Sequence, residues 1–304
     1  MAKRAAIVLA GLISIIFWTS ASADVYRGDT KFPDILEIVI TGDITQRDLS
    51  FFSSRSKDLE TKQVHVWLDS RGGDVVSAME IGRIIRSVDG WTYIGDNARC
   101  YSSCALIFIA GVDRYNYGEF GLHRPYFASA PLSREQIEKQ MPVMRSAVKK
   151  YVEEMGITDS FFERMFNTEP SAIEIYRGDE SEKIVPHTDP TYDEIATSNQ
   201  AQQYGVTTSE IRRRESLWNS TCATFFPYQG SGDRKKFVDC YLSIMWGLSV
   251  EDYRSRSAKA TAKCGAEYSD SEKQIISATP RKERFSLPFA VRRRTCFLNT
   301  MSGK

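Results

Sequence analysis

The stretch that decides the fold is CYSSCALIFIAGVDRYNYGEFGLHRP, residues 100–125. It begins with a turn of small residues, CYSSC, which leads directly into the apolar run ALIFIA and stops at Gly111. This pattern predicts a buried helix with Ser102 at its N-terminus. A helix N-terminus presents unpaired N–H groups and the positive end of the helix dipole. That environment suits a serine that becomes an alkoxide and a substrate oxygen that becomes an oxyanion.

A histidine follows this serine after 21 positions (123 − 102). His123 ends a short extended segment, and the chain contains only three histidines. A hydroxyl nucleophile needs an adjacent base, so His123 is the candidate general base for Ser102. The other two histidines are interpreted as structural or solvent-facing, because His65 alternates with core residues on a predicted strand and His187 lies in a proline-flanked loop.

Strands and helices alternate in the sequence before the serine turn. The alternation predicts an α/β layered core, in which sites collect where strand ends meet helix N-termini. The expected elements are a strand at 35–40, a helix of about fifteen residues capped by Thr45, a strand at 64–68, a tight glycine turn at 69–73, a helix at 75–88 and a strand at 91–94.

Length and composition are those of an ordinary globular protein. The 304 residues are 42% hydrophobic and 26% charged, enough to bury a sizeable core in one large domain with a smaller one beside it. Residues 1–23 have a basic start, a short apolar run and the small residues ASA before Asp24, which predicts a signal peptide cleaved between Ala23 and Asp24. The apolar run is shorter than the ~20 residues of a membrane span, although an uncleaved anchor stays open as an alternative. The mature protein is therefore expected to be periplasmic or secreted.

Export places the cysteines in an oxidising compartment, where an even number predicts disulfides. The candidates are Cys100, Cys104, Cys222, Cys240, Cys264 and Cys296. Two of them bracket Ser102, and residues four apart across a turn into a helix can approach the ~5.5–6 Å Cα separation of a disulfide. The alternative is that Cys104 is only a small buried residue, with Cys100 free or paired elsewhere. No CxxC occurs, so no metal site is expected.

Charge divides the chain near residue 210. Residues 210–304 contain 18 Lys and Arg against 10 Asp and Glu, a balance of +8, which leaves −7 for residues 1–209 out of the total of +1. We therefore expect an α/β domain at 24–209 and a basic, mainly helical domain at 210–304, held by disulfides. The basic face could bind an acidic partner or a membrane surface, but a solvated face is favoured, and no nucleic-acid partner is expected.

Three segments together resemble a known family. LDSRGGDVVSAMEIGRII resembles the glycine turn and following helix of the Clp protease proteolytic subunit, YSSCALIFIAG its nucleophile helix, and GLHRP its catalytic histidine segment. The Cys-x-Ser-x-Cys turn is most similar to exported, periplasmic Clp-protease-like proteins. The resemblance covers roughly residues 34–125 and 190–208. It implies a Clp/crotonase-like layered core of repeated strand-strand-helix units.

The resemblance also implies the remaining site residues. TYDEIATSNQAQQYG is similar to the segment that carries the family's catalytic aspartate, which places Asp193 as the third member of a triad with Ser102 and His123. The polar stretch before it leaves Asp179, Asp189 and Glu194 open as alternatives. The resemblance assigns the oxyanion hole to the backbone N–H groups of Gly73 and Ser103. Since backbone groups act there, Ser103 in place of the family's methionine need not abolish it.

These features predict an exported, ATP-independent serine peptidase that cleaves unfolded or short peptides. No cofactor is expected. The family's subunit depends on an ATP-driven unfoldase, and no ATPase partner is expected outside the cytoplasm. The protein is expected to be a homo-oligomer, as the resemblance implies. The alternative is that the methionines of the helix predicted at 133–154 serve the core alone. The main alternative is a catalytically inactive scaffold that binds a peptide or protein, and a more distant one is crotonase-type acyl-CoA chemistry.

Overall fold

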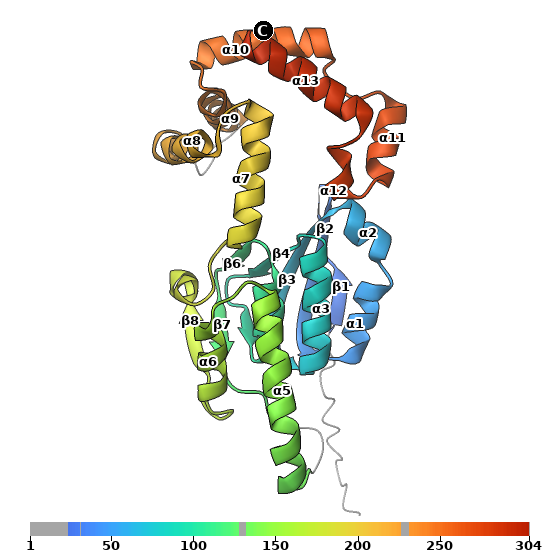
Figure 1. Ribbon diagram of the computed structural model, residues 1–304, viewed down its shortest axis with the longest axis vertical. Coiled ribbons are helices and arrows are strands. Elements are labelled where there is room, and N and C mark those ends of the chain that lie inside the picture. Colours follow the sequence, from blue (N-terminus) through green and yellow to red (C-terminus); the bar gives the residue numbers. More distant parts are fainter. Residues whose placement is uncertain (1–23, 31, 128–131, 226–230, 304) are drawn as a thin grey trace, which may run out of the picture.

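A mixed eight-stranded sheet forms the body of the protein (Figure 1). The computed structural model describes residues 24–30, 32–127, 132–225 and 231–303, so the predicted signal peptide lies outside the described residues. The strands are β1 Asp24–Arg27, β2 Ile35–Ile44, β3 Gln63–Gly73, β4 Trp91–Ile94, β5 Arg99–Tyr101, β6 Arg114–Asn116, β7 Glu119–Leu122 and β8 Glu174–Arg177. Their main order is β1-β2-β3-β5-β7-β8, with β4 between β3 and β6 in a side branch. The predicted α/β class is therefore confirmed.

Strand β3 is the branch point of this sheet. Its first half pairs with β4 in parallel, from His65 opposite Trp91 onward, and Ser70 then pairs with Cys100 of β5. The tight turn predicted at residues 69–73 is wrong, because these residues continue the strand. Gly72 and Gly73 pair with the end of β2 at φ angles of 104° and 147°. The two glycines thus carry the strand through an unusual backbone path rather than reversing it.

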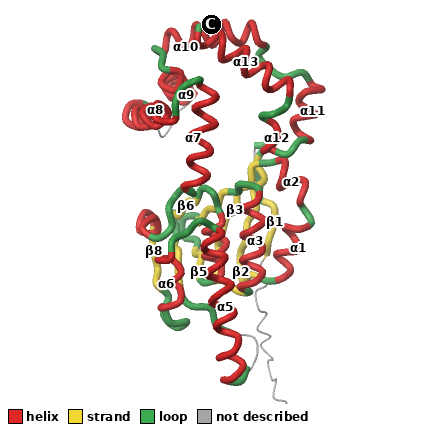
Figure 2. Tube along the Cα trace, viewed as in Figure 1, coloured by secondary structure: helices red, strands yellow, loops and turns green. Residues whose placement is uncertain are grey.

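Helices of the N-terminal part pack over the sheet (Figure 2). They are α1 Gln46–Ser53, α2 Ser56–Thr61, α3 Val75–Ser87, α4 Ser103–Ala110, α5 Arg134–Glu154 and α6 Asp159–Asn167, with the short 3-10 helix η1 at Gly178–Lys183. The Thr45 cap is confirmed, although the single helix expected there is divided at Ser54. The helix predicted at 133–154 is confirmed as α5, which begins with a capping box of Ser133 and Gln136. Helix α6 was not predicted.

Helix α4 is the buried centre of the body, and all eight of its residues are buried. Side chains from other elements satisfy its carbonyl groups: the Tyr151 hydroxyl donates to Leu106 (2.7 Å) and the Thr92 hydroxyl to Phe108 (2.8 Å). A Cβ on Gly82 of α3 would lie 1.8 Å from the Tyr151 hydroxyl oxygen, so this glycine makes room for the bond. The helix is therefore fixed by both packing and hydrogen bonds.

The C-terminal part is helical and arches over one end of the body (Figure 1). Its helices are α7 Pro190–Tyr204, α8 Thr208–Thr221, α9 Ser231–Trp246, α10 Val250–Cys264, α11 Asp270–Ala278, α12 Arg281–Arg284 and α13 Pro288–Ser302. A small core joins Ala201 of α7 to Ile211 and Met245, so the helical arrangement begins before the expected boundary at 210. Among the described helices, none combines the length and apolar character needed to cross a membrane.

Disulfides staple this helical part, as predicted. Cys222 is bonded to Cys240 and Cys264 to Cys296. The far end of the arch returns to the body at α12, where Lys282 lies 3.1 Å from Asp89. Together with the bond between Cys100 and Cys104, the three disulfides indicate an oxidising, extracytoplasmic environment.

Candidate functional site

Ser102 occupies a sharp turn between β5 and α4. The prediction that it lies at the N-terminus of a buried helix is confirmed. Its φ of 58° and ψ of −125° belong to a region that residues other than glycine rarely adopt. The turn is held by its backbone, since Ser102 N–H donates to Gly121 O (3.0 Å) and Ala105 N–H donates to Ser102 O (3.0 Å). Its hydroxyl makes no capping bond and its side chain is only partly buried.

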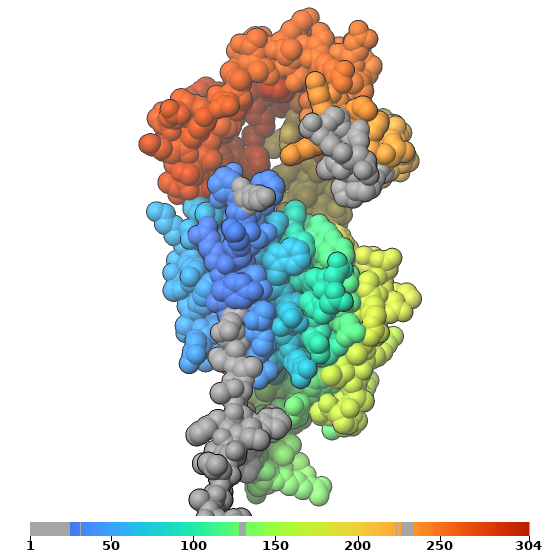
Figure 3. Space-filling view, turned by 180° about the vertical axis from the view of Figure 1, so that it is seen from behind, coloured from blue at the N-terminus to red at the C-terminus, as the bar shows by residue number. Residues whose placement is uncertain are grey.

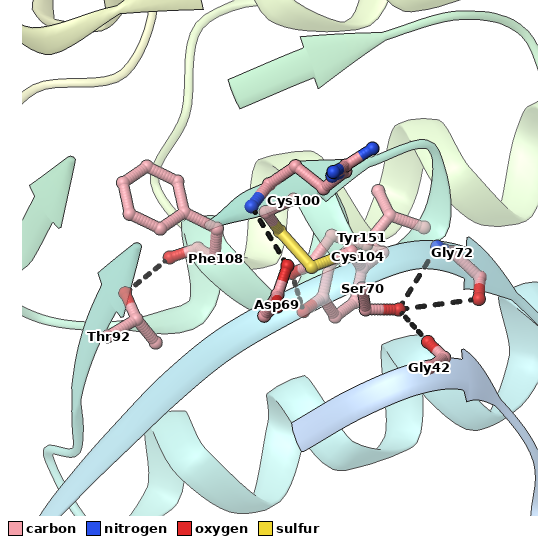
Figure 4. Close-up of a disulfide and its surroundings, with 11 residues drawn as sticks. Gly42, Asp69, Ser70, Gly72, Thr92, Cys100, Cys104, Phe108 and Tyr151 are labelled. Atoms are coloured by element: carbon pink, nitrogen blue, oxygen red, sulfur yellow. Dashed lines mark hydrogen bonds between the residues drawn. A yellow bond between two sulfur atoms is a disulfide. The ribbon is translucent and has the colours of Figure 1, made fainter. Parts of the chain in front are cut away.

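The predicted disulfide across this turn is confirmed (Figure 4). Cys100 and Cys104 are bonded at a Cα separation of 5.2 Å, and both are fully buried. The bond links Cys100, in the middle of β5, to the first turn of α4, so it closes the loop that carries Ser102. A covalent link this local restricts the turn directly.

Gly72 lies against the serine turn. A Cβ added at Gly72 would be 2.8 Å from Ser102 Cβ, 2.9 Å from Tyr101 O and 3.1 Å from Ser103 N. Any side chain at this position would therefore collide with the turn and cover the Ser103 N–H. Ser103 begins α4, so its N–H has no acceptor within the helix. The glycine leaves room beside that donor.

Ser70 of β3 forms hydrogen bonds to Gly72 and to Gly42 of β2 (Figure 4). Its buried hydroxyl lies 2.5 Å from Gly42 O, to which it donates, and accepts from Gly72 N–H (3.1 Å). This bridge fixes β3 to β2 at the residues that approach Ser102. The sequence prediction missed Ser70, whose only signal is its place two residues before the first glycine.

His123 follows the end of β7, beside the serine turn. Strands β5 and β7 are parallel neighbours with Tyr101 opposite Gly121, so the residues that follow each strand emerge side by side, with backbones about 5 Å apart. The side chain is 6% exposed, and its Nδ1 lies 3.0 Å from Arg124 O. The Tyr126 ring lies 6.0 Å away. The structure therefore brings Ser102, Ser103, His123 and the glycine pair to one edge of the sheet.

Asp193 does not join this group. It lies in α7 and forms a two-point ion pair with Arg212, in which Nη1 lies 3.0 Å from Oδ1. Helix α7 begins beside the C-terminus of α4, where Asp189 N–H donates to Val112 O (2.8 Å). Ser102 lies at the other end of α4, about 12 Å away for eight helical residues. From there, α7 rises away from the body (Figure 1).

The alternative acids are also engaged or distant. Asp189 is buried, caps α7 by accepting from Tyr192 N–H (2.9 Å) and pairs with Arg86 (3.0 Å). Asp179 and Glu194 are exposed on η1 and α7. Across the described ranges, no carboxylate is hydrogen-bonded to His123. The backbone carbonyl of Arg124 takes the place that a carboxylate would occupy.

Metal ligands do not gather at this site. Among the residues that the structure describes, no group of three or more His, Cys, Asp or Glu side chains is arranged to hold a metal ion. The arrangement itself offers the Ser102 hydroxyl, the His123 imidazole and the backbone N–H of Ser103.

Comparison with known proteins adds no assignment. No protein-family model matches this chain, and no curated protein matches it.

Proposed function

We propose that this chain is an exported, ATP-independent serine peptidase with Ser102 as the nucleophile and His123 as the general base. The observation that carries the proposal is the strained turn at Ser102. It lies beside the end of β7, which His123 follows, and next to the N–H of Ser103 at the start of α4. Strain of this kind costs of order 1–3 kcal/mol and concentrates at functional sites. The resemblance of three sequence segments to the Clp proteolytic subunit supports the same roles.

In the proposed reaction, Ser102 Oγ attacks the acyl carbon of a peptide bond while His123 Nε2 takes its proton. The tetrahedral intermediate collapses, and His123 returns the proton to the leaving amine. Water then attacks the ester carbonyl while His123 takes its proton. The bond from the acyl carbon to Ser102 Oγ breaks, His123 returns the proton to Ser102 Oγ, and the acid product leaves.

His123 is oriented for this role by its neighbour. With Nδ1–H donating to Arg124 O, the neutral imidazole leaves Nε2 unprotonated and able to accept the serine proton. A neutral carbonyl stabilises the imidazolium less than a carboxylate does. The geometry therefore supports a Ser102–His123 pair oriented by a carbonyl rather than the expected triad with Asp193, and a slower enzyme than a complete triad would give.

The oxyanion hole of the proposal consists of Ser103 N–H and Gly73 N–H. Gly72 donates to Ser70 and Asp74 donates to Ile44 O (2.8 Å), both on the β2 side of β3. Gly73 N–H lies between these two engaged donors, and the resemblance assigns it to the oxyanion hole. Removal of one such donor costs about 3–4 kcal/mol of transition-state stabilisation in serine peptidases.

The finer architecture and the partners belong to the same proposal. We interpret the division of β3 between two groups of strands as the layering of a Clp/crotonase-like core. The expected substrates are short or unfolded peptides, since no ATP-driven unfoldase is available outside the cytoplasm. Homo-oligomers are proposed through α5, whose first half extends beyond the body and exposes Ile137 and Val143 (Figure 1).

A second candidate is a catalytically inactive scaffold of the same fold that binds peptides. The observation in its favour is that His123 has a backbone carbonyl, not a carboxylate, at Nδ1. The two candidates differ in whether Ser102 turns over substrate.

Degradation of unfolded, carboxymethylated casein without ATP tests the proposal. We expect release of peptides by the wild type and none by Ser102→Ala or His123→Gln. The matched control is Ser103→Ala, which keeps the backbone N–H and removes a buried hydroxyl that has no hydrogen-bond partner among the described residues. Casein that stays intact with wild type, while still binding to it, would favour the scaffold.

A further inference from the structure

A second candidate site lies apart from Ser102, in a cavity of about 430 Å³ between β6 and η1. None of the residues of the candidate active site lines it. In the view from behind (Figure 3), the green strand region that includes β6 lies beside the yellow segment that includes η1. The volume is in the range of small-ligand pockets and suits one group of amino-acid size.

Aromatic rings lead across the sheet into this cavity. Trp67, Tyr93 and Tyr115 are directly opposite one another on β3, β4 and β6, with ring centroids 4.6 Å and 4.8 Å apart. Tyr115 lines the cavity together with Tyr117, whose ring is close to parallel to it (21°) at a centroid distance of 6.3 Å. Tyr117 is 58% exposed. The cavity therefore has aromatic rings in its lining, with the exposed Tyr117 on the solvent side and the His187 ring edge-on to Tyr115 at a centroid distance of 4.5 Å.

The charges at the cavity are mainly negative. Asp96, Asp179 and Glu182 line it, and all three are exposed. Within the described ranges, none of the three forms an ion pair with a lysine or arginine, and His187 lies 4.0 Å from Glu182. The one arginine of the lining is Arg114, which is buried. Carboxylates beside aromatic faces favour a cation, through Coulomb attraction and cation–π contact.

Two buried donors also line the cavity without an acceptor. Asn116 Nδ2 and Arg114 Nη2 are inaccessible to solvent and form no hydrogen bond within the described part of the chain. Asp189 Oδ2 lies 3.8 Å from the same Nη2 but is shared with Arg86 at 3.0 Å, so Arg114 adds part of a positive charge at the buried end of the cavity. A buried amide N–H without a partner is unfavourable, so an acceptor oxygen brought by a ligand would be favoured here.

We propose that this cavity binds an arginine side chain presented by a peptide. The guanidinium lies against Tyr115 and Tyr117 and pairs with the carboxylates of Asp179 and Glu182, while a peptide carbonyl accepts from Asn116 Nδ2. Arginine fits better than lysine because its planar group stacks on aromatic faces and donates in pairs to carboxylates. The proposal is independent of catalysis at Ser102.

Isothermal titration of the full chain carrying Ser102→Ala tests this site without turnover. The probes are acetyl-Ala-Arg-Ala-amide and the same peptide with citrulline, which keeps the size and shape of arginine but lacks its charge. We expect the arginine peptide to bind at least tenfold more tightly, and its affinity to fall as salt is raised from low to ~0.5 M. Equal affinities for the two peptides, or no binding of either, would overturn the proposal.

Paired variants locate the binding. Asp179→Asn with Glu182→Gln should weaken the arginine peptide at least tenfold, and Tyr117→Ala should weaken it severalfold. Glu194→Gln removes one exposed carboxylate outside the cavity and should leave the affinity unchanged. Arginine binding that persists in the double variant, or that falls equally with Glu194→Gln, would place the interaction elsewhere and refute the assignment.

Discussion

Replacement of Gly72 by alanine should disturb the serine turn directly. The new Cβ would lie 2.8 Å from Ser102 Cβ, whereas carbon atoms in ordinary contact are ~3.5–4.0 Å apart. Either the turn or β3 must move by about 1 Å. Displacement of that size at a packed site costs ~1–3 kcal/mol, and an alanine at φ 104° adds ~1–3 kcal/mol of backbone strain. The smaller entropy of the unfolded alanine chain returns ~0.4–1 kcal/mol.

We therefore expect Gly72→Ala to lower the free energy of unfolding by roughly 2–5 kcal/mol in urea titration, within the scale set by those terms. Gly178→Ala is the matched control, because Gly178 also has a positive φ (50°) but nothing lies within 4 Å of its added Cβ. The control should lose only ~1–2 kcal/mol, the cost of a left-handed residue. Equal losses for the two variants would show that Gly72 does not contact the turn as described.

Three further outcomes follow from the contacts around the site. Removal of both Cys100 and Cys104 as alanines should cost only ~2 kcal/mol in urea titration, since the closed loop is short, but should slow fluorophosphonate labelling at least ~10-fold, because ~1 Å of misplacement is costly to catalysis. Asp193→Asn and Arg212→Gln should each lower the free energy of unfolding by less than ~1 kcal/mol, as expected for an exposed ion pair, and should leave fluorophosphonate labelling unchanged. Loss of labelling in Asp193→Asn alone would restore Asp193 as a catalytic residue. Burial, with a smaller contribution from a nearby arginine, lowers the pKa of His65 to about 4, so the unfolded chain binds a proton near pH 6.5 before the folded one does. Wild type should thus lose stability relative to His65→Phe as the pH falls from about 6.5 to 4, and parallel profiles would contradict this.

Local signals in the sequence predicted the elements that position the serine. The predicted helix at 75–88 and strand at 91–94 agree with α3 and β4 within one residue, because in each the apolar residues repeat at a regular spacing and a cap or a glycine marks the end. The apolar run after Ser102 gave α4 for the same reason. The disulfide at Cys100 could be predicted because its partner is only four residues away.

Non-local contacts explain what the sequence could not predict. Residues 69–73 resemble a turn by composition, and only their pairing with β2 makes them a strand. The placement of Asp193 depends on which end of α4 the chain returns to after residue 177, and no local period specifies that return. Arg124 O, the group found at His123, is a backbone atom and has no signature in a sequence.

The reactivity of Ser102 tests the central claim most directly. The full chain is treated with diisopropyl fluorophosphate, and the mass of every peptide is measured after digestion. The proposed function predicts one adduct, on the peptide that contains Ser102, which disappears in His123→Gln and persists in Ser103→Ala. No adduct on the wild type, or an adduct whose yield does not depend on His123, would contradict it.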